Sequence, residues 1–135
     1  STMEKEGKGY IVASFGKESG AVPYTTFMAK QSYLKEHEKT AVEFVRALLK
    51  AGKWVQETDA ETVAKTVQPY FKDTKTDMLA SSIERYRSQG SFSSDMILTK
   101  SGWNTIQDIM KEAGELDHTV PYDKLVNASI VKKAK

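Results

Sequence analysis

The sequence contains no cysteine, and this absence removes several kinds of chemistry. Disulfide bridges, thiol catalysis and cysteine-ligated zinc sites are all excluded. No apolar run approaches the roughly 18 residues that a membrane-spanning helix needs, so we expect no direct membrane insertion. What is present, 39% hydrophobic and 28% charged residues with only three prolines, is the composition of a soluble globular protein.

An excess of charge of one sign is also missing. The chain has 20 basic and 18 acidic residues, which gives a formal net charge of +2. Binding to nucleic acid or to an anionic membrane needs a clustered basic surface, which so even a balance does not favour. We therefore expect no nucleic-acid partner.

The length of 135 residues suits one domain. No signal peptide is recognisable, and Ser1-Thr2-Met3 does not resemble a natural protein start. We therefore expect the chain to be a piece of something longer.

The stretch from Gly9 to Lys30 has the pattern of two extended segments joined by a polar loop. Tyr10–Ser14 is a short, partly β-branched apolar run, and Tyr24–Ala29 is a second apolar run that follows a proline. Eight residues separate Ser14 from Pro23, whereas tight hairpins use about two to five. The pattern predicts two strands that are not joined as a simple hairpin.

A long amphipathic helix is predicted from about Glu38 to Glu57. Its apolar residues recur at helical spacing, so one face should be buried. The members of this stripe are Ala41, Val45, Leu48 and Val55, widened by Phe44 and Leu49.

Further helices are predicted after it from capping signals. Thr58-Asp59-Ala60-Glu61 has capping-box spacing, and Thr74–Asp77 is a weaker start signal. Thr99 can cap a helix that carries Trp103 and ends at Gly114. The helix before it can end at Gly90.

A short final helix is predicted from Pro121 through Leu125, with a frayed tail over residues 132–135.

Histidine and glycine patterns do not predict a metal or a cofactor. His37-Glu38 begins an H-E-x-x-H pattern, but the second histidine position is Ala41, and His118 has no ligand set nearby. Residues 16–20 lack the order of a phosphate-binding loop. Two interpretations stay open for this loop: its hydroxyl and backbone groups meet a small ligand, or it is a plain connection.

No carboxylate pair lies in an apolar setting that would raise a pKa for acid–base chemistry, so we expect no catalysis. Trp103 falls in a helical stripe and is expected in a core, with partial exposure toward a cleft as the alternative.

Two stretches carry a resemblance to a known family. "GYIVASFGKESGAVPYTTFMAKQSYL" and "ERYRSQGSFSSDMILTKSGWNTIQDIMKEAGELDHTVPYDKLV" resemble the C-terminal part of bacterial ABC-importer substrate-binding proteins. The subfamily binds nitrate, taurine, aliphatic sulfonates or thiamine pyrimidine precursors. The resemblance extends from Gly9 to about Ala134.

The resemblance implies an α/β fold, a type II periplasmic-binding-protein-like portion that is mainly helical with two hinge-region strands. Residues 1–135 would be the C-terminal portion of a two-lobe protein. The second hinge crossing would lie at about 9–30, and a helical return to the first lobe at about 31–135. The N-terminal half, with much of the ligand pocket, would lie outside this chain.

The implied function is capture of a solute and its delivery to an ABC permease, without catalysis. Ligand contacts from this portion would come from Ser14, Phe15, Gly16, Tyr24 and Thr25. The parent protein would be extracellular or periplasmic and membrane-tethered. The chain would pack against its own N-terminal half or self-associate.

Two alternatives remain. One is an enzyme resembling thiamine-precursor synthases, although such relatives carry a cysteine-rich motif that this chain cannot supply. The other is an independent helical interaction module.

Overall fold

The computed structural model describes residues 2–20 and 22–135, and every regular element in that part is helical. The elements, in chain order, are α1 (Thr2–Lys5), α2 (Phe15–Glu18), α3 (Gln31–Glu36), α4 (Glu38–Glu57), α5 (Ala60–Val67), the 3-10 helix η1 (Gln68–Tyr70), α6 (Thr76–Ser88), α7 (Lys100–Glu112), α8 (Tyr122–Leu125) and α9 (Ser129–Ala134).

The predicted α/β fold is wrong for this chain. None of the described residues lies in a β-strand, and the two expected hinge strands, Tyr10–Ser14 and Tyr24–Ala29, have no regular structure. A strand exists only through hydrogen bonds to a neighbouring strand, and an isolated pair of short runs has none. The β-branched and aromatic content that suggested strands reflects apolar character, not a local preference strong enough to form a sheet.

The chain divides into two compact units. The first unit comprises the residues up to Ser19 together with Lys50–Ser94, and the second comprises Gly20–Leu49 together with Asp95–Lys135. Helix α4 contributes its last turns to the first unit and its earlier turns to the second.

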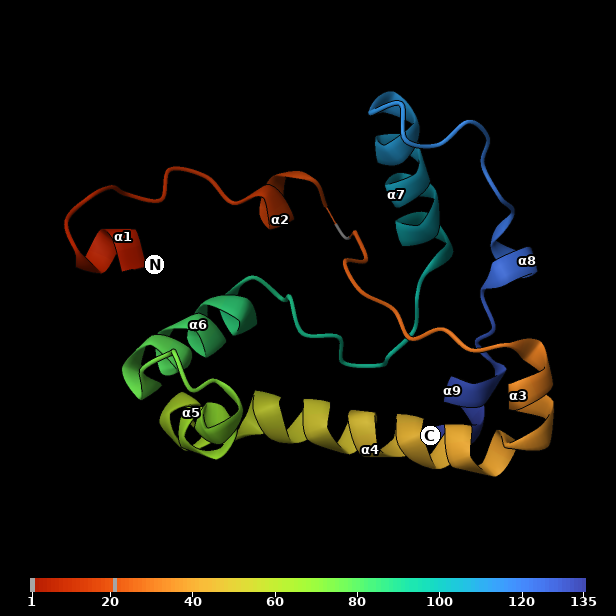
Figure 1. The fold of residues 1–135 in the computed structure, drawn as a ribbon, viewed down its shortest axis with the longest axis horizontal. Coiled ribbons are helices and arrows are strands. Elements are labelled where there is room, and N and C mark those ends of the chain that lie inside the picture. Colours follow the sequence, from red (N-terminus) through yellow and green to blue (C-terminus); the bar gives the residue numbers. More distant parts are fainter. Residues whose placement is uncertain (1, 21) are drawn as a thin grey trace. The chain divides into compact units, whose positions relative to one another are not determined.

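The core of the first unit lies between α5 and α6, which pack side by side (Figure 1). Residues three and four apart on each helix share a face, so the apolar positions of both helices meet. The buried members are Ala60, Val63, Ala64, Leu79 and Ile83, and Val55, Val67, Ala80 and Phe92 pack around them.

Helix α5 begins with a side-chain cap, but from a different residue than predicted. The carboxylate of Asp59 accepts a hydrogen bond from the backbone N–H of Thr62 at 2.8 Å, so Asp59 and not Thr58 is the N-cap. Asp59 satisfies one of the free N–H groups at the helix start and places a negative charge at the positive end of the helix dipole.

Glycines end two helices, as predicted. After α7, Gly114 has a φ of 76°. Its N–H donates to the carbonyl of Lys111, and the N–H of Glu115 donates to the carbonyl of Met110. After α6, Gly90 has a φ of 65° and the same pair of bonds forms. These are Schellman motifs, in which the left-handed residue lets the chain turn back on the helix's last carbonyls.

In the first unit, Arg87 ties α6 to the end of α4. Its guanidinium donates to the backbone carbonyls of Val55 and Thr58, and it also pairs with Glu84 at 3.3 Å. The last carbonyls of a helix have no partner within the helix, so Arg87 satisfies groups that would otherwise face the core unpaired.

In the second unit, the C-terminal segment forms helix α9, which polar contacts join to α4, so the predicted fraying is wrong. Residues Ile130, Val131 and Ala134 of α9 are buried. Lys133 pairs with Glu38, and Arg46 donates to the carbonyl of Ala134 at 3.3 Å. The lysine-rich sequence suggested a solvated tail, but burial of one apolar face holds it in place. The helix predicted to be the last one is α8, and α9 is a further helix that follows it.

Helix α4 spans the predicted residues, Glu38–Glu57, which confirms the helix. Its expected core stripe is only half-buried: Val45, Leu48 and Val55 all retain some exposure, and no residue of α4 is fully buried. The apolar period correctly marked one face of the helix, but the described chain only partly covers that face.

We predict that Leu79→Ala destabilises the first unit by about 2–5 kcal/mol, because Leu79 is 8% exposed and its loss leaves a cavity in the α5–α6 core. Urea unfolding followed by circular dichroism measures the change. Leu125→Ala, at a leucine that is 66% exposed, is the matched control and should change stability little. Equal effects of the two variants would show that Leu79 does not lie in a packed core.

We predict that the Asp59 cap makes α5 sensitive to acid. The backbone N–H of Thr62, and then its hydroxyl, hold the pKa of Asp59 below its ordinary value. The stability that the cap contributes is therefore complete above the ordinary pKa and is lost as the pH falls through the lowered one.

The stability of the wild-type chain should therefore fall as the pH is lowered below about 4. The Asp59→Asn variant has an uncharged cap, so its stability should fall less over the same pH interval. If the stability of the two proteins fell equally with pH, the Asp59 cap would not be the source of the acid sensitivity.

Candidate functional site

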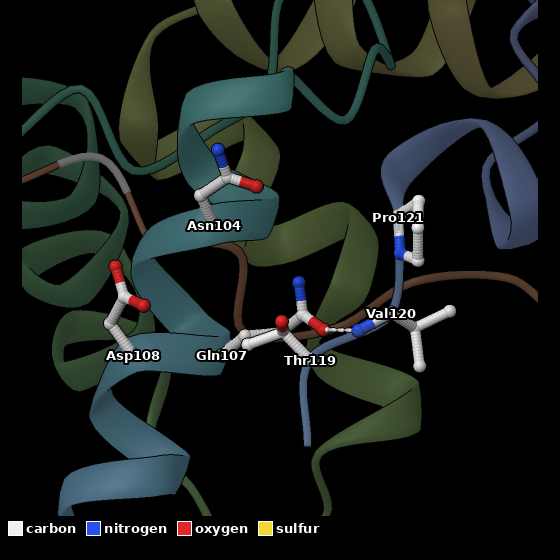
Figure 2. A pocket seen from close by; sticks show the side chains of 6 residues that line it. All are labelled: Asn104, Gln107, Asp108, Thr119, Val120 and Pro121. Atoms are coloured by element: carbon white, nitrogen blue, oxygen red, sulfur yellow. Dashed lines mark hydrogen bonds between the residues drawn. The ribbon is translucent and has the colours of Figure 1, made fainter.

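An open polar pocket of about 350 Å³ lies in the second unit, beside α7. Helix α7 contributes Asn104, Gln107 and Asp108, which share one face because they are three and four residues apart. The returning segment Thr119–Pro121 forms the other wall (Figure 2).

The capped ends of α7 bring these two walls together. The hydroxyl of Thr99 accepts from the N–H of Gly102 at 3.1 Å, which fixes where the helix begins, as predicted. The Schellman motif at Gly114 reverses the chain after the helix. The segment that follows therefore runs back along α7 and reaches Val120 beside the middle of the helix.

Two α7 side chains hold the backbone of Val120. The side-chain oxygen of Gln107 accepts from the Val120 N–H at 2.6 Å (Figure 2), and the indole N–H of Trp103 donates to the Val120 carbonyl at 2.8 Å. Both main-chain groups of Val120 are thus satisfied by residues four apart on one helix. Gln107 is buried, so these bonds are shielded from water and gain in strength.

The next residues are fixed in the same manner. The hydroxyl of Tyr122 in α8 donates to the carbonyl of Leu98, just before α7, at 2.6 Å. The pocket therefore has a fixed wall on both sides.

The chemistry available in the pocket is neutral donors and acceptors with one negative charge. Asn104 offers an amide, Thr119 a hydroxyl and Asp108 a carboxylate, and all three are exposed. Groups of this kind suit a small polar molecule with hydroxyl or amino groups. Because they face water, each bond to such a molecule would contribute modestly.

No group of three or more histidine or acidic side chains that could hold a metal ion occurs among the described residues. Likewise, no helix in the described part of the chain is long and apolar enough to span a membrane.

Three of the five predicted ligand-contact residues lie in the first unit, at the start of α2. Ser14 has an extended backbone and is the N-cap residue, with its carbonyl accepting from the N–H groups of Lys17 and Glu18. Phe15 follows and is 94% exposed, and Gly16 is exposed beside it. A short helical turn, α2, therefore lies where the sequence predicted a polar loop.

The other two, Tyr24 and Thr25, lie in the second unit in a segment without regular structure, and both are exposed. Within their own units Phe15, Gly16, Tyr24 and Thr25 are exposed and Ser14 is half-buried, and the role of all five in binding stays a prediction.

Sequence reasoning missed Gln107 and Val120. The available signal was the position of Gln107, a polar residue four after Trp103 inside the apolar stripe of α7. A polar side chain there is either exposed or bonded to something specific. Trp103 is half-buried with its indole N–H bonded to Val120, which gives it a structural role at the edge of the pocket.

Comparison with known proteins gives one strong match. A protein of Bacillus subtilis (strain 168) with the name "Putative binding protein YtlA" is 50% identical to this chain over 133 residues. The match includes 98% of this chain and 40% of that protein, so the chain spans less than half the length of this relative. No protein-family model and no solved structure matches the chain. The chain is thus similar to part of a protein named for binding.

We predict that Gln107→Leu exposes the Val120 amide to exchange. The substitution removes the acceptor for that N–H while keeping a side chain of similar size on α7. Amide hydrogen exchange at Val120 should accelerate about fivefold to a hundredfold, because the lost bond is shielded.

Asn104→Leu is the matched control, since Asn104 lines the same pocket on the same helix without bonding Val120. Unchanged exchange in Gln107→Leu would show that the bond does not hold the segment.

Proposed function

We propose that this chain is part of a solute-binding protein that captures a small organic or anionic nutrient and delivers it to an ABC importer. The observation that carries the proposal is the 50% identity, over 98% of the chain, to a relative named as a binding protein. The sequence resemblance at Gly9–Lys30 and in the segments of α6 to α8 supplies the finer class of nutrient: a sulfonate, taurine, nitrate or a thiamine pyrimidine precursor.

The proposed action is binding without making or breaking a covalent bond. Capture needs groups that complement the solute and exclude water, and neither requires a nucleophile or a general base. The name of the relative supports a binding role in this general sense.

The residues that we assign to the solute are Ser14, Phe15, Gly16, Tyr24 and Thr25. Hydroxyl and backbone N–H groups donate to the oxygens of a sulfonate or nitrate, and the aromatic faces of Phe15 and Tyr24 cover its apolar part or stack on a pyrimidine. Their accessibility in the described chain supports the assignment, because none of the five residues is buried in a core.

The chain spans 40% of the relative, so part of the solute site is proposed to come from residues outside it. We place the whole protein outside the cytoplasm, tethered to the membrane, where it would present the bound solute to the permease. Closure around a solute is the usual means by which such proteins signal that they are loaded.

One observation favours a second candidate, an independent helical interaction module. The first unit has its own apolar core between α5 and α6, as a self-standing module would. Solute capture remains the stronger candidate, because the similarity to a binding protein includes both units.

We predict that one class of these nutrients stabilises the full-length protein. A ligand at 100 times its Kd raises stability by about 2.7 kcal/mol, which a thermal-shift panel of sulfonates, taurine, nitrate and aminopyrimidines detects. Ser14→Ala and Thr25→Ala should each weaken the binding of the responding compound about three- to tenfold.

Asn104→Ala and Thr119→Ala in the polar pocket are matched controls, since they remove similar groups from the other candidate site. If these controls weaken binding and the first pair does not, the solute lies at the α7 pocket. A full-length protein that responds to no compound, and whose deletion leaves uptake of all of them unchanged, would contradict solute capture.

A further inference from the structure

The side-chain amide of Gln107 keeps one donor that the chain does not use. Gln107 is 6% exposed and lines the pocket beside α7. Its oxygen accepts from the Val120 N–H at 2.6 Å, and because only the oxygen of an amide accepts, the NH2 group faces elsewhere (Figure 2). One N–H of that group donates to the Trp103 carbonyl at 3.4 Å, and the other has no partner among the residues that the structure describes. A largely buried donor without a partner favours a ligand that brings an acceptor to it.

The rim of the pocket carries a negative charge that nothing in the described chain neutralises. Asn104 and Thr119 can each donate and accept hydrogen bonds, whereas the carboxylate of Asp108 only accepts. Asp108 forms no ion pair with a described residue, and this includes Lys111 on the same helix. None of the six residues that line the pocket is basic. The pocket therefore attracts a cation and repels an anion.

The size of the pocket and its second wall limit the ligand further. The volume is about 350 Å³, within the range of ligand sites in proteins. A water molecule takes about 30 Å³ of the liquid, so the pocket has room for roughly a dozen non-hydrogen atoms. Val120 and Pro121 add apolar atoms to the wall opposite α7, and these suit the carbon atoms of a compact ring.

We propose that the pocket beside α7 binds a small hydroxylated amine of about the size of an amino sugar. Its ammonium group pairs with Asp108, and one of its hydroxyl oxygens accepts from the free N–H of Gln107. Its other hydroxyl groups bond to Asn104 and Thr119, and its ring carbons lie against Pro121.

This ligand is a second one, separate from the proposed nutrient. None of the five residues that we assign to the nutrient lines the pocket, and all six that do belong to the second unit. Nitrate and aliphatic sulfonates are anions, which the charge of Asp108 disfavours. The inference therefore goes beyond solute capture.

A ligand in this pocket touches both of its walls at once. When the segment Thr119–Pro121 moves away from α7, the bonds to Val120 break and one wall of the pocket is lost. The ligand thus binds only the closed form. At ten times its Kd it lowers the population of the open form about tenfold.

The test is a titration of the 135-residue chain with glucosamine, glucose and glucuronate. Nuclear magnetic resonance follows the Val120 amide and the side-chain NH2 of Gln107. The three sugars are of similar size and carry a positive charge, no charge and a negative charge. We expect glucosamine to bind most tightly, glucose about threefold and glucuronate about tenfold more weakly, because an exposed charge contributes modestly. No saturable shift with glucosamine, or any other order of affinities, would overturn the proposal.

The variant Asp108→Asn separates the charge from the other contacts. It should abolish the preference for glucosamine over glucose and leave the affinity for glucose within about twofold, because an amide of the same size still forms hydrogen bonds. Asp117→Asn removes an exposed negative charge of the same unit that does not line the pocket, so this matched control should keep the preference. Survival of the preference in Asp108→Asn, or its loss in both variants, would overturn the proposal.

Amide hydrogen exchange gives a second readout. Glucosamine at ten times its Kd should slow exchange at Val120 about tenfold, because exchange there requires the open form. Exchange at Val63, in the core of the first unit, is the control and should not change. Unchanged exchange at Val120 would show that the sugar binds elsewhere, and equal slowing at both residues would show a general effect. Either result would contradict the site.

Failure of this site and failure of solute capture can be told apart. The three sugars lie outside the nutrient classes proposed above, so glucosamine binding together with a failed nutrient screen would remove the proposed function and keep the site. A nutrient response without glucosamine binding would do the reverse.

Discussion

Every backbone N–H and C=O group needs a hydrogen-bond partner, and this structure depends on that constraint. Helices meet it locally, and for this reason a chain with no strand among its described residues can still be ordered over most of its length. Where the chain leaves a helix, the groups must be satisfied by something else. Asp59 and Thr99 do so at helix starts, and the turns at Gly90 and Gly114 do so at helix ends.

Longer-range order in both units comes largely from side chains that bond to main chain. Arg87 reaches the last carbonyls of α4, Arg46 reaches those of α9, and Gln107 with Trp103 holds Val120. Each bond joins segments that are distant in sequence and that share few buried apolar residues outside the α5–α6 core. Because these bonds are directional, they fix register where a small core would leave it loose.

The sequence was sufficient for features that depend on neighbours along the chain. The span of α4, the Thr99 cap and the glycine stops were all predictable, because helical period, capping and positive φ are local properties. It was insufficient where a distant partner decides. The β-branched run at Tyr10–Ser14 indicated a strand, but strands need partners that the described chain does not provide. Fraying of the tail was wrong because burial of Ile130 against its own unit outweighs the local lysines. The role of Gln107 depends on Val120, thirteen residues away, and only its odd place in an apolar stripe hinted at it.

The same reasoning applies to the predicted ligand-contact residues, which lie in or beside segments without regular structure. Ser14 and Phe15 adjoin residues 9–13 of the first unit, and Tyr24 and Thr25 lie within residues 22–30 of the second, and neither of these two segments has regular structure. Residues in such segments acquire fixed positions only when their backbone and apolar neighbours find partners, and preorganised groups are what binding a small polar solute requires. The polar pocket beside α7 shows the contrast, because its walls are fixed by bonds within one unit.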